Sequence, residues 1–478
     1  MIDITHPLSM VLFVSDSECH PAISETSNNT VKEVRVPRKT VIIGGGAAGL
    51  GAATGAKTAD PSADVAVYTQ AADSVYGSAG TPADPADVED FEKLLVADKQ
   101  AYTDAGVSVT FGAEVTAIDT AAKTITVGGA SVAYDSLVIA AGSGTGDTVP
   151  GSDLTGVFHV NGGRSVSEWN DVISGTKSAV VVNAGGVGLE IVTALAKRGV
   201  ETHLVEASGQ VLPTLLDPDF AAIVQDGWTE LGVHLHLNTS VEEFVGEGAV
   251  RAVRTSEGEI VADLVVVATN RAADTAVAAA AGITVGPGGG IVVDDHMKTS
   301  AADVWAAGDV AEVAHGGGAT PLLGLTTSHA FAEGRAAGTN AAGGDRVYKA
   351  VRIPWSTQAG SSVVGGTAFN ETSAAAAGIA YVKGEAQGIS RARYYPGVNM
   401  VKVKLLAETG TLRLIGAQLL GGGEGIKERA NFLAQAVKTG LTLTDLSTME
   451  NVYSPAIGAL NEPIVVAATN GVANAQKG

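Results

Sequence analysis

Three glycines near the start of the chain have the spacing of a phosphate-binding loop. Gly44, Gly46 and Gly49 form a G-x-G-x-x-G pattern between an apolar, β-branched run and an alanine-rich stretch. In such a setting a strand turns tightly into a helix whose free N–H groups and dipole attract a pyrophosphate. A lone pattern is weak, but its strand-then-helix context indicates a dinucleotide site. The contacts expected there are Gly44, Gly45, Gly46, Ala48 and Gly49.

A second, less complete glycine pattern follows further along the chain. Gly185 and Gly188 occupy two of its three glycine positions, and Asn183 occupies the first. Asparagine accepts a left-handed backbone more readily than most residues, so the turn is expected to survive. The next strand ends at Glu206, where a carboxylate favours the free 2′-hydroxyl of NAD over the 2′-phosphate of NADP. The pattern therefore predicts an NADH site rather than an NADPH site.

A threonine at a further strand end could contact the first nucleotide. Thr69 ends the expected second strand, where a carboxylate commonly holds a ribose hydroxyl and a threonine would bind it more weakly. A strand-end threonine without a ligand is an equal alternative. Gly308 and Asp309 end a short apolar strand at residues 304–307. By itself, that pair indicates only a turn that contains an aspartate.

Length and charge limit the class of protein. A chain of 478 residues is too long for one hydrophobic core, so roughly two to four domains are expected. The formal net charge of −21, from 51 acidic and 30 basic residues, argues against nucleic acid or an anionic membrane as a partner. The sequence has no apolar run of about eighteen residues and no signal-peptide pattern in residues 1–37, so we expect a cytoplasmic protein.

The cysteine content excludes two kinds of site. Cys19 is the only cysteine in the sequence, so neither an intrachain disulfide nor a cysteine-rich metal site can form. We therefore expect no metal ligands in this chain.

The elements that would position these residues alternate between strands and helices over most of the chain. Apolar strands are expected at residues 40–43, 64–69, 114–119, 134–143 and 201–206. A helix is expected from residue 91 to beyond Tyr102. From about residue 352 the pattern changes to antiparallel strands, expected at 391–395, 400–406 and 412–418, and an amphipathic helix at 427–439.

Taken in chain order, these motifs resemble those of the pyridine nucleotide-disulfide oxidoreductases, above all the coenzyme A-disulfide reductase and NADH oxidase group. The resemblance covers about residues 38–470. It rests on the first glycine pattern, a Tyr-x-x-x-Gly-x-Pro segment at 76–82, an E-V-x-x-I-D strand at 114–119 and the strand end Ala141-Gly142. It implies that FAD contacts Thr69, Val115, Ala141, Gly142, Gly308 and Asp309, with Asp309 at the ribityl chain.

The same resemblance implies an α/β fold with two Rossmann-like dinucleotide-binding domains, for FAD and NAD(P), and a C-terminal α+β dimerisation domain. The expected divisions are an extension at 1–37, an FAD domain at 38–150 and 275–345, an NAD(P)-like domain at 151–274 and a dimerisation domain at 346–478. A homodimer that acts on a small-molecule substrate or electron acceptor is therefore expected.

The redox cysteine of the resembled group is missing from this sequence. Ala79 stands at its position, and Cys19 precedes the first strand. Thiol–disulfide exchange requires a thiolate, so disulfide reduction is not expected. The sequence leaves open whether Ala79 is natural or an engineered replacement.

Three departures from the resembled group bear on the NADH site. Asn183 replaces a glycine, Gly186 stands where relatives carry a tyrosine at the nicotinamide pocket, and Asn270 stands where they carry a glycine. A Rossmann domain kept only as a scaffold therefore remains an alternative to a working NADH site.

One tyrosine near the C-terminus is the candidate catalytic residue. Tyr453 lies in a segment that, in the resembled group, crosses the dimer interface to the partner's flavin. There it could act as an acid or a hydrogen-bond donor. A tyrosine that only packs at the interface, with its hydroxyl satisfied, is an equal alternative.

These observations predict an FAD-dependent oxidoreductase in which NADH reduces the flavin. The electrons then pass to a non-disulfide acceptor such as oxygen, a quinone or an electron carrier. One alternative is an FAD enzyme that oxidises or reduces a small organic substrate directly, without NAD(P)H. The other is a non-catalytic flavin-binding subunit of a complex.

Overall fold

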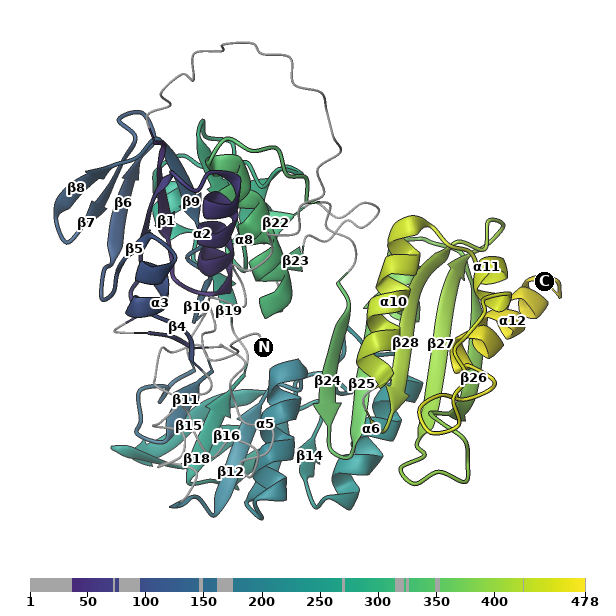
Figure 1. Ribbon diagram of the computed structural model, residues 1–478. Coiled ribbons are helices and arrows are strands. Elements are labelled where there is room, and N and C mark those ends of the chain that lie inside the picture. Colours follow the sequence, from purple (N-terminus) through teal and green to yellow (C-terminus); the bar gives the residue numbers. More distant parts are fainter. Residues whose placement is uncertain are drawn as a thin grey trace, which may run out of the picture.

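The computed structural model describes residues 37–71, 74–76, 95–145, 149–160, 175–268, 271–313, 322–323, 326–348, 353–423 and 425–477. The chain forms three units, which Figure 1 shows at the upper left, at the bottom and at the right. Cys19, Ala79 and Asn270 lie outside the described residues, as do most of the 76–82 segment and the extension up to residue 36.

The first unit is a Rossmann-like layer around a five-stranded sheet in which every neighbouring pair is parallel. Its strands are short apolar runs, and β1 and β9 are buried because helices and loops cover both faces. The sheet order is β21 (Val304–Ala306), β9 (Ser136–Ile139), β1 (Lys39–Ile43), β2 (Asp64–Tyr68) and β5 (Val107–Thr110). Its helices are α2 (Ala47–Ala59), α3 (Lys99–Asp104), α7 (Ala276–Ala280) and α8 (Thr327–Ala341).

Helices α2 and α8 lie side by side and touch through glycines (Figure 1). A Cβ on Gly334 would lie 2.0 Å from the Ala48 carbonyl oxygen, and one on Gly338 would lie 1.9 Å from that of Ala52. Only glycine permits so close a backbone approach. This packing joins α8, which comes late in the sequence, to the helix that begins at the first glycine loop.

Small sheets complete the first unit. They are β6 (Val115–Asp119) with β7 (Thr124–Val127) and β8 (Ala130–Ala133), β3 (Ser74–Tyr76) with β4 (Leu95–Asp98), and β22 (Ala311–Val313) between β20 (Ile291–Val293) and β23 (Leu322–Leu323). A further pair, β10 (Ser143–Thr145) with β19 (Arg271–Ala273), follows the sheet edge. The predicted helix from residue 91 is wrong over Leu95–Asp98, because pairing with β3 makes that stretch a strand and α3 begins at Lys99.

The second unit repeats the Rossmann pattern. Its five parallel strands lie in the order β11 (Val157–His159), β18 (Leu264–Val267), β12 (Ser178–Val182), β13 (Glu201–Val205) and β14 (His234–His236). Helices α5 (Gly186–Lys197) and α6 (Pro218–Glu230) cover one face. A meander of β15 (Val241–Glu247), β16 (Ala249–Thr255) and β17 (Gly258–Val261) packs against the other face, where Val205 and Phe244 share a core.

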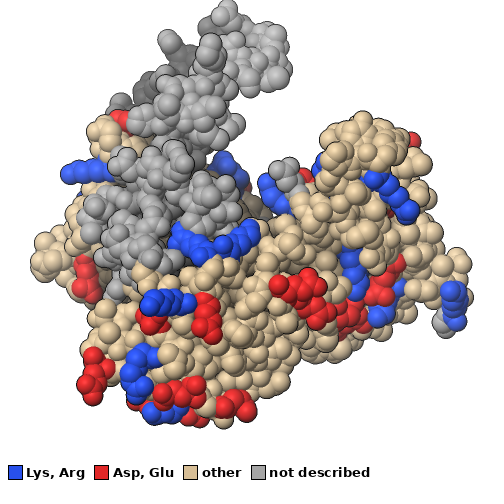
Figure 2. All heavy atoms as spheres, turned by 90° about the horizontal axis from the view of Figure 1, so that it is seen from below, with Lys and Arg blue, Asp and Glu red and all other residues tan. Residues whose placement is uncertain are grey.

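Charged residues on the underside of the molecule are of both signs. Figure 2 shows acidic and basic side chains interspersed on this face. Ion pairs such as Arg251–Glu259 and Arg254–Glu243 on the meander follow this pattern. Exposed pairs of this kind each stabilise a fold by about 0–1 kcal/mol, so the core and not the surface holds the unit together.

The third unit is an antiparallel sheet with helices, as the change of pattern near residue 352 predicted. The order is β24 (Trp355–Ala359), β25 (Ser362–Ala368), β28 (Leu414–Gly421), β27 (Met400–Glu408) and β26 (Tyr381–Ile389), with α9 (Glu371–Ala376), α10 (Gly425–Thr439), α11 (Leu443–Ser447) and α12 (Pro463–Ala475). The strand predicted at 391–395 is wrong. That segment forms the turn before β27, Pro396-Gly397 follows it, and Tyr394 is 75% exposed.

A buried lysine joins the second and third units. The Lys404 side chain on β27 is 2% exposed, and its Nζ lies 3.1 Å from Asp217, 2.7 Å from Asp219 and 2.7 Å from Glu371. Burial alone would lower the pKa of Lys404, but hydrogen bonds to the three carboxylates raise it above its ordinary value. Removing one partner of a buried pair costs about 3–5 kcal/mol, so this cluster fixes the junction.

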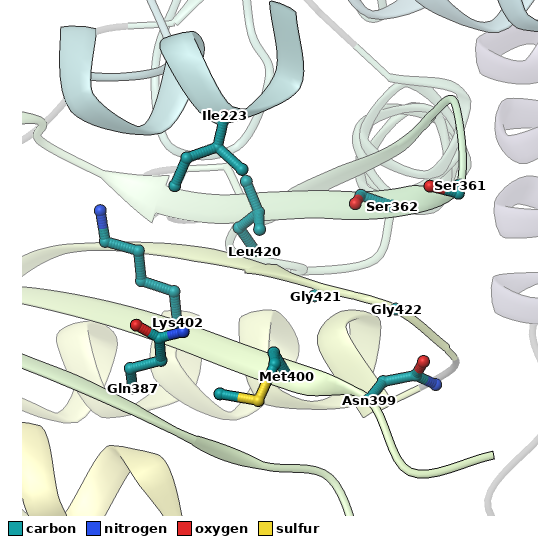
Figure 3. A pocket seen from close by; sticks show the side chains of 10 residues that line it. All are labelled: Ile223, Ser361, Ser362, Gln387, Asn399, Met400, Lys402, Leu420, Gly421 and Gly422. Carbon is teal, nitrogen blue, oxygen red and sulfur yellow. The ribbon is translucent and has the colours of Figure 1, made fainter. Parts of the chain in front are cut away.

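A cavity of about 470 Å³ lies beside this junction, between α6 and the sheet of the third unit (Figure 3). Ile223 of α6 points toward Leu420 of β28, and Lys402 extends to donate to Asp219 Oδ2 at 3.0 Å. None of the described residues that line this cavity belongs to either glycine pattern. In the described part of the chain, no helix combines the length and apolar character of a membrane span.

Candidate active site

The three glycines of the first loop differ in what a side chain there would meet. Gly44 has φ +101°, and a Cβ there would lie 2.1 Å from the Ala140 carbonyl oxygen. A Cβ on Gly49 would lie 1.9 Å from the Gly44 carbonyl oxygen, so the helix start can pack onto the turn only without a side chain. At Gly46 no described protein atom lies within 4 Å of a Cβ, which leaves open space beside the backbone. This open space would allow a pyrophosphate to approach the backbone closely.

The helix that follows the first loop offers a site for an anion. Gly46 is the N-cap of α2, and among the described residues no side chain caps it and no acidic residue lies in the first turn. The first N–H groups of a helix lack intrahelical partners and carry the positive end of the dipole. The start of α2 is therefore suited to a phosphate.

The parallel sheet brings most residues predicted for the first nucleotide to one edge. Gly44 and Gly45 follow β1, Thr69 follows β2, Ala141 and Gly142 follow β9, and Gly308 and Asp309 follow β21. Ligands of such sheets bind outside the carboxyl ends, where the strand order reverses. Val115 is 9% exposed on the separate β6 meander, whose start is tied to the edge by a bond from Ala113 N–H to the Thr69 carbonyl at 2.8 Å.

Thr69 packs beneath the first loop. It is 6% exposed, its Oγ1 accepts from Ala71 N–H at 3.2 Å, and a Cβ on Gly45 would lie 3.1 Å from it. A hydroxyl that accepts one bond can also donate one. The position suits a ribose contact, which stays a prediction.

A buried glutamate on α8 supports the Gly308-Asp309 turn. Gly308 N–H donates to Glu333 Oε2 at 2.8 Å, and Ser143 Oγ donates to Asp309 Oδ2 at 3.1 Å. Burial raises the pKa of Glu333 to about 7, with a smaller contribution from the charge of Asp309. The sequence prediction missed Glu333, although a lone acid within a helix of small residues was a signal that could have identified it.

The second loop repeats the backbone of the first. Asn183 has φ +83°, so the predicted survival of the turn is confirmed, and a Cβ on Gly188 would lie 2.0 Å from its carbonyl oxygen. The side chain makes the difference. Asn183 Oδ1 accepts from Gly185 N–H at 2.8 Å, and it also lies 2.8 Å from a Cβ on Gly185. An asparagine side chain thus fills the space that is open at Gly46.

The carboxylate of Glu206 is tied to the second loop. Glu206 is 4% exposed, with Oε2 accepting from Ala184 N–H and Oε1 from Ser208 N–H, both at 2.8 Å. Each carboxylate oxygen can accept more than one bond, so a ribose hydroxyl could still share this group. The structure places Glu206 beside the loop and shows that it shapes the backbone there.

The third unit touches the second loop through Thr357 of β24. Its Oγ1 donates to the Gly186 carbonyl or to Glu190 Oε1, each at 3.1 Å. Burial raises the pKa of Glu190, and the bond from Thr357 opposes part of that rise. The sequence prediction named neither Thr357 nor Glu190, because nothing in the spacing of β24 relates it to the loop.

Tyr453 lies apart from both glycine loops within one chain. It is 46% exposed between α11 and α12, on the unit that Figure 1 shows on the opposite side from α2. A hydrogen bond with Tyr453 raises the pKa of Tyr394, and Ala392 N–H donates to the Pro455 carbonyl at 3.0 Å. The turn at 391–395 therefore braces the Tyr453 loop.

Comparison with known proteins agrees with this geometry. Residues 38–334 match the family described as pyridine nucleotide-disulphide oxidoreductase, and residues 358–462 match its dimerisation domain. An NADH oxidase of Methanocaldococcus jannaschii is 30% identical over 443 residues, which cover 90% of this chain and 98% of the relative. A CoA-dependent NAD(P)H sulfur oxidoreductase of Pyrococcus abyssi is 29% identical over 450 residues, or 92% of this chain and 99% of the relative.

A solved structure shows the same arrangement. The NAD-dependent persulfide reductase from A. fulgidus matches with a TM-score of 0.84 and 29% identity, covering 92% of this chain and 83% of that chain. The predicted fold class, family and dependence on FAD are confirmed. The chain therefore belongs to the pyridine nucleotide-disulphide oxidoreductase family and is an FAD-dependent oxidoreductase.

Proposed function

We propose that the chain is an NADH-linked flavoenzyme that passes its electrons to an acceptor other than a disulfide, with oxygen as the first candidate. The observation that carries this proposal is the repeated loop geometry. Gly44 and Asn183 share a left-handed backbone, and Gly49 and Gly188 share the same close approach. Two such loops in one chain suit two dinucleotides, one bound as cofactor and one as electron donor.

The first unit would hold FAD, which when bound accepts a hydride and releases electrons to the acceptor. Its pyrophosphate would lie at the start of α2, beside Gly46, where described protein atoms leave space. Thr69 would contact the ribose, and Asp309 would contact the ribityl chain. The remaining contacts of the proposal are Gly44, Gly45, Ala48, Gly49, Val115, Ala141, Gly142 and Gly308.

The second unit would bind NADH in preference to NADPH. Its phosphate contacts would come from the start of α5, at Gly185 and Gly188. Glu206 is 4% exposed at the strand end where a ribose hydroxyl would lie. A buried carboxylate there repels a 2′-phosphate, because two like charges would share a site of low polarity.

The cysteine content of this chain argues against a reaction with disulfides or persulfides. The relative from Pyrococcus abyssi is named a sulfur oxidoreductase and the one from Methanocaldococcus jannaschii an NADH oxidase. Our chain has a single cysteine, Cys19, and carries Ala79 where the group has its redox thiol. Without a thiolate at that position, exchange with disulfides or persulfides lacks its nucleophile. Oxygen, a quinone or an electron carrier needs no such group.

The active form would be a homodimer built through residues 346–478, with the FAD domain at 38–150 and 275–345 and the NAD domain at 151–274. Large apolar side chains are exposed around Tyr453: Val452 at 85%, Ile457 at 75% and Leu460 at 67%. Such a patch on a dimerisation domain suits a subunit interface. Tyr453 would then reach the flavin of the partner subunit and act there as a hydrogen-bond donor.

Rapid mixing tests the proposal. The purified flavoprotein is mixed without oxygen with NADH or NADPH while the visible absorbance of the flavin is followed, and air is then admitted. We expect fast bleaching by NADH, slower bleaching by NADPH and reoxidation by oxygen. Bleaching by a small organic donor but by neither nucleotide would contradict the proposal in favour of direct substrate oxidation.

A further inference from the structure

Four polar side chains gather on one face of the second unit's sheet. Glu201 and His203 are two residues apart on β13, and His234 and His236 are two residues apart on the edge strand β14. Side chains two apart on a strand share a face, and the register pairs His203 with His234. The sheet thus brings together residues that are about thirty positions apart in the sequence.

Two of the histidines point the same ring nitrogen at one carboxylate oxygen. His203 Nε2 lies 3.7 Å and His234 Nε2 3.9 Å from Glu201 Oε1, and all three atoms lie within 4.8 Å of one another. Tetrahedral zinc ligands with bonds of about 2.0–2.1 Å stand about 3.4 Å apart. Small rotations of the exposed Glu201 and His234 side chains would close that difference.

His236 has the place of an orienting partner. Its Nε2 lies 3.0 Å from His203 Nδ1, and the two rings are stacked with centroids 5.3 Å apart. When His203 carries its proton on Nδ1 and donates to His236, the lone pair of Nε2 faces Glu201. Histidines that ligate metals commonly make such a second hydrogen bond, which fixes the tautomer and the ring.

An acidic cluster at the unit junction provides a contrast. Asp217, Asp219 and Glu371 also bring three ligand atoms within 4.8 Å of one another. There the Lys404 ammonium lies within 3.1 Å of all three carboxylates and compensates their charge. The histidine cluster instead opens to solvent, because the side chains of Glu201 and His234 are 61% and 54% exposed.

We propose that Glu201, His203 and His234 bind a divalent transition-metal ion of the zinc class, with His236 as a positioning residue. Two imidazoles and one carboxylate are a ligand set that zinc accepts, and solvent supplies the remaining position. The ion ties the edge strand β14 to β13. Glu206 N–H donates to the His236 carbonyl at 2.9 Å, so the clamp lies next to the strand end that shapes the second loop.

Titration calorimetry with zinc chloride tests this site. The protein is the untagged, full-length flavoprotein, stripped with a chelator and dialysed. We expect one zinc per chain in the wild type, and an affinity at least about tenfold weaker in His203→Ala and in His234→Gln. His236→Gln should keep the stoichiometry and weaken binding by roughly 10–100-fold, as expected for an orienting partner.

His296→Gln is the matched control. His296 is another exposed histidine, paired with Asp345 at 3.0 Å on the first unit, and its variant should bind zinc like the wild type. His234 is exposed, so its substitution should leave the fold intact, and equal flavin content verifies this. A wild type without stoichiometric zinc, or equal affinities in His234→Gln and His296→Gln, overturns the proposal. Unchanged affinity in His236→Gln overturns the role of His236.

Discussion

The two glycine loops have nearly the same backbone and differ in what fills them. Beside Gly46 no described protein atom lies within 4 Å of a Cβ, whereas at Gly185 the Asn183 Oδ1 lies 2.8 Å away. In the first loop Gly44 N–H donates to the Tyr68 carbonyl at 2.8 Å, and among the described residues no side chain caps the start of α2. The second satisfies Gly185 N–H with its own side chain and Ala184 N–H with Glu206. This difference agrees with the proposal that the first loop holds FAD as a cofactor and the second binds NADH as an exchangeable electron donor.

The strand ends next to the loops differ in the same sense. Thr69 is a neutral residue that packs under Gly45, whereas Glu206 is a buried carboxylate that binds two backbone N–H groups. Buried N–H groups without hydrogen-bond partners cost free energy. When the nucleotide leaves, a loop whose N–H groups are bonded to its own side chains therefore loses little stability. The glycine pattern therefore determines the backbone of each loop, whereas the flanking side chains determine how a ligand binds there.

The largest effect is expected for Gly44→Ala, which would break the first loop. Gly44 has φ +101° and a Cβ there would lie 2.1 Å from the Ala140 carbonyl oxygen. Left-handed backbone and overlap together should cost about 3 kcal/mol or more and strip the protein of flavin.

Gly46→Ala is the matched control, because its Cβ meets no described protein atom. It should fold normally and lose only FAD affinity, as measured by flavin content and thermal unfolding. Full FAD affinity in Gly46→Ala would contradict the proposal that a pyrophosphate lies in the open space beside Gly46.

The second largest effect is expected for Glu206→Ala. This change leaves the N–H groups of Ala184 and Ser208 without their carboxylate partner. Lost bonds to a charged group, at about 1.5–3 kcal/mol, should weaken NADH binding by roughly tenfold or more and relax the preference against NADPH. Flavin content should not change, since the first loop is untouched. Stopped-flow reduction at varied NADH and NADPH measures both affinities, and an unaltered ratio between them would be evidence against the ribose assignment.

The stability of the first unit should depend on pH through Glu333. Burial raises the pKa of Glu333 to about 7 from an ordinary value of 4.5. The folded chain therefore binds this proton more tightly than the unfolded chain does. The stability that comes from it is fully present below about pH 4.5 and is lost as the pH rises through about 7, up to roughly 3 kcal/mol.

Glu333→Gln removes this titration while keeping an oxygen that can accept from Gly308 N–H. Thermal unfolding of the two proteins between pH 5 and 8 is the measurement. The wild type should lose stability relative to the variant as the pH rises. A constant difference across this range would show that Glu333 keeps an ordinary pKa.

The smallest effect is expected for Asn183→Gly, which makes the second loop like the first. The change frees Gly185 N–H for a phosphate, and one such bond contributes about 1 kcal/mol. NADH should bind roughly fivefold more tightly, while flavin content stays the same. Equal or weaker NADH binding would mean that the asparagine does not compete with the nucleotide.

Much of the backbone could be predicted from the sequence because it depends on local rules. Glycine spacing gave both loops, and the tolerance of asparagine for positive φ anticipated Asn183 at +83°. The carboxyl ends of parallel strands lie at the same edge of a sheet, so the sequence pattern was enough to predict that Asp309 lies at the same edge as Gly44.

The rest depends on tertiary contacts that spacing does not encode. Whether the Asn183 side chain faces Gly185 is decided by packing, and Glu333 comes from a helix that packs against α2 through close glycine contacts. The histidine cluster was missed because its members meet only through the register of β13 and β14. Residues 391–395 have strand-forming side chains, but the Pro396-Gly397 turn overrides that preference.

We propose that this chain brings two dinucleotides together without a redox thiol. The most direct measurement is an anaerobic titration of the flavoprotein with NADH, followed across the visible spectrum. We expect a single equivalent of NADH per flavin to complete the reduction and no long-wavelength thiolate–flavin band to develop, because Ala79 offers no sulfur. A second equivalent consumed per flavin, or the appearance of that band, would contradict this proposal by showing that a sulfur centre, which could only be Cys19, shares the electrons.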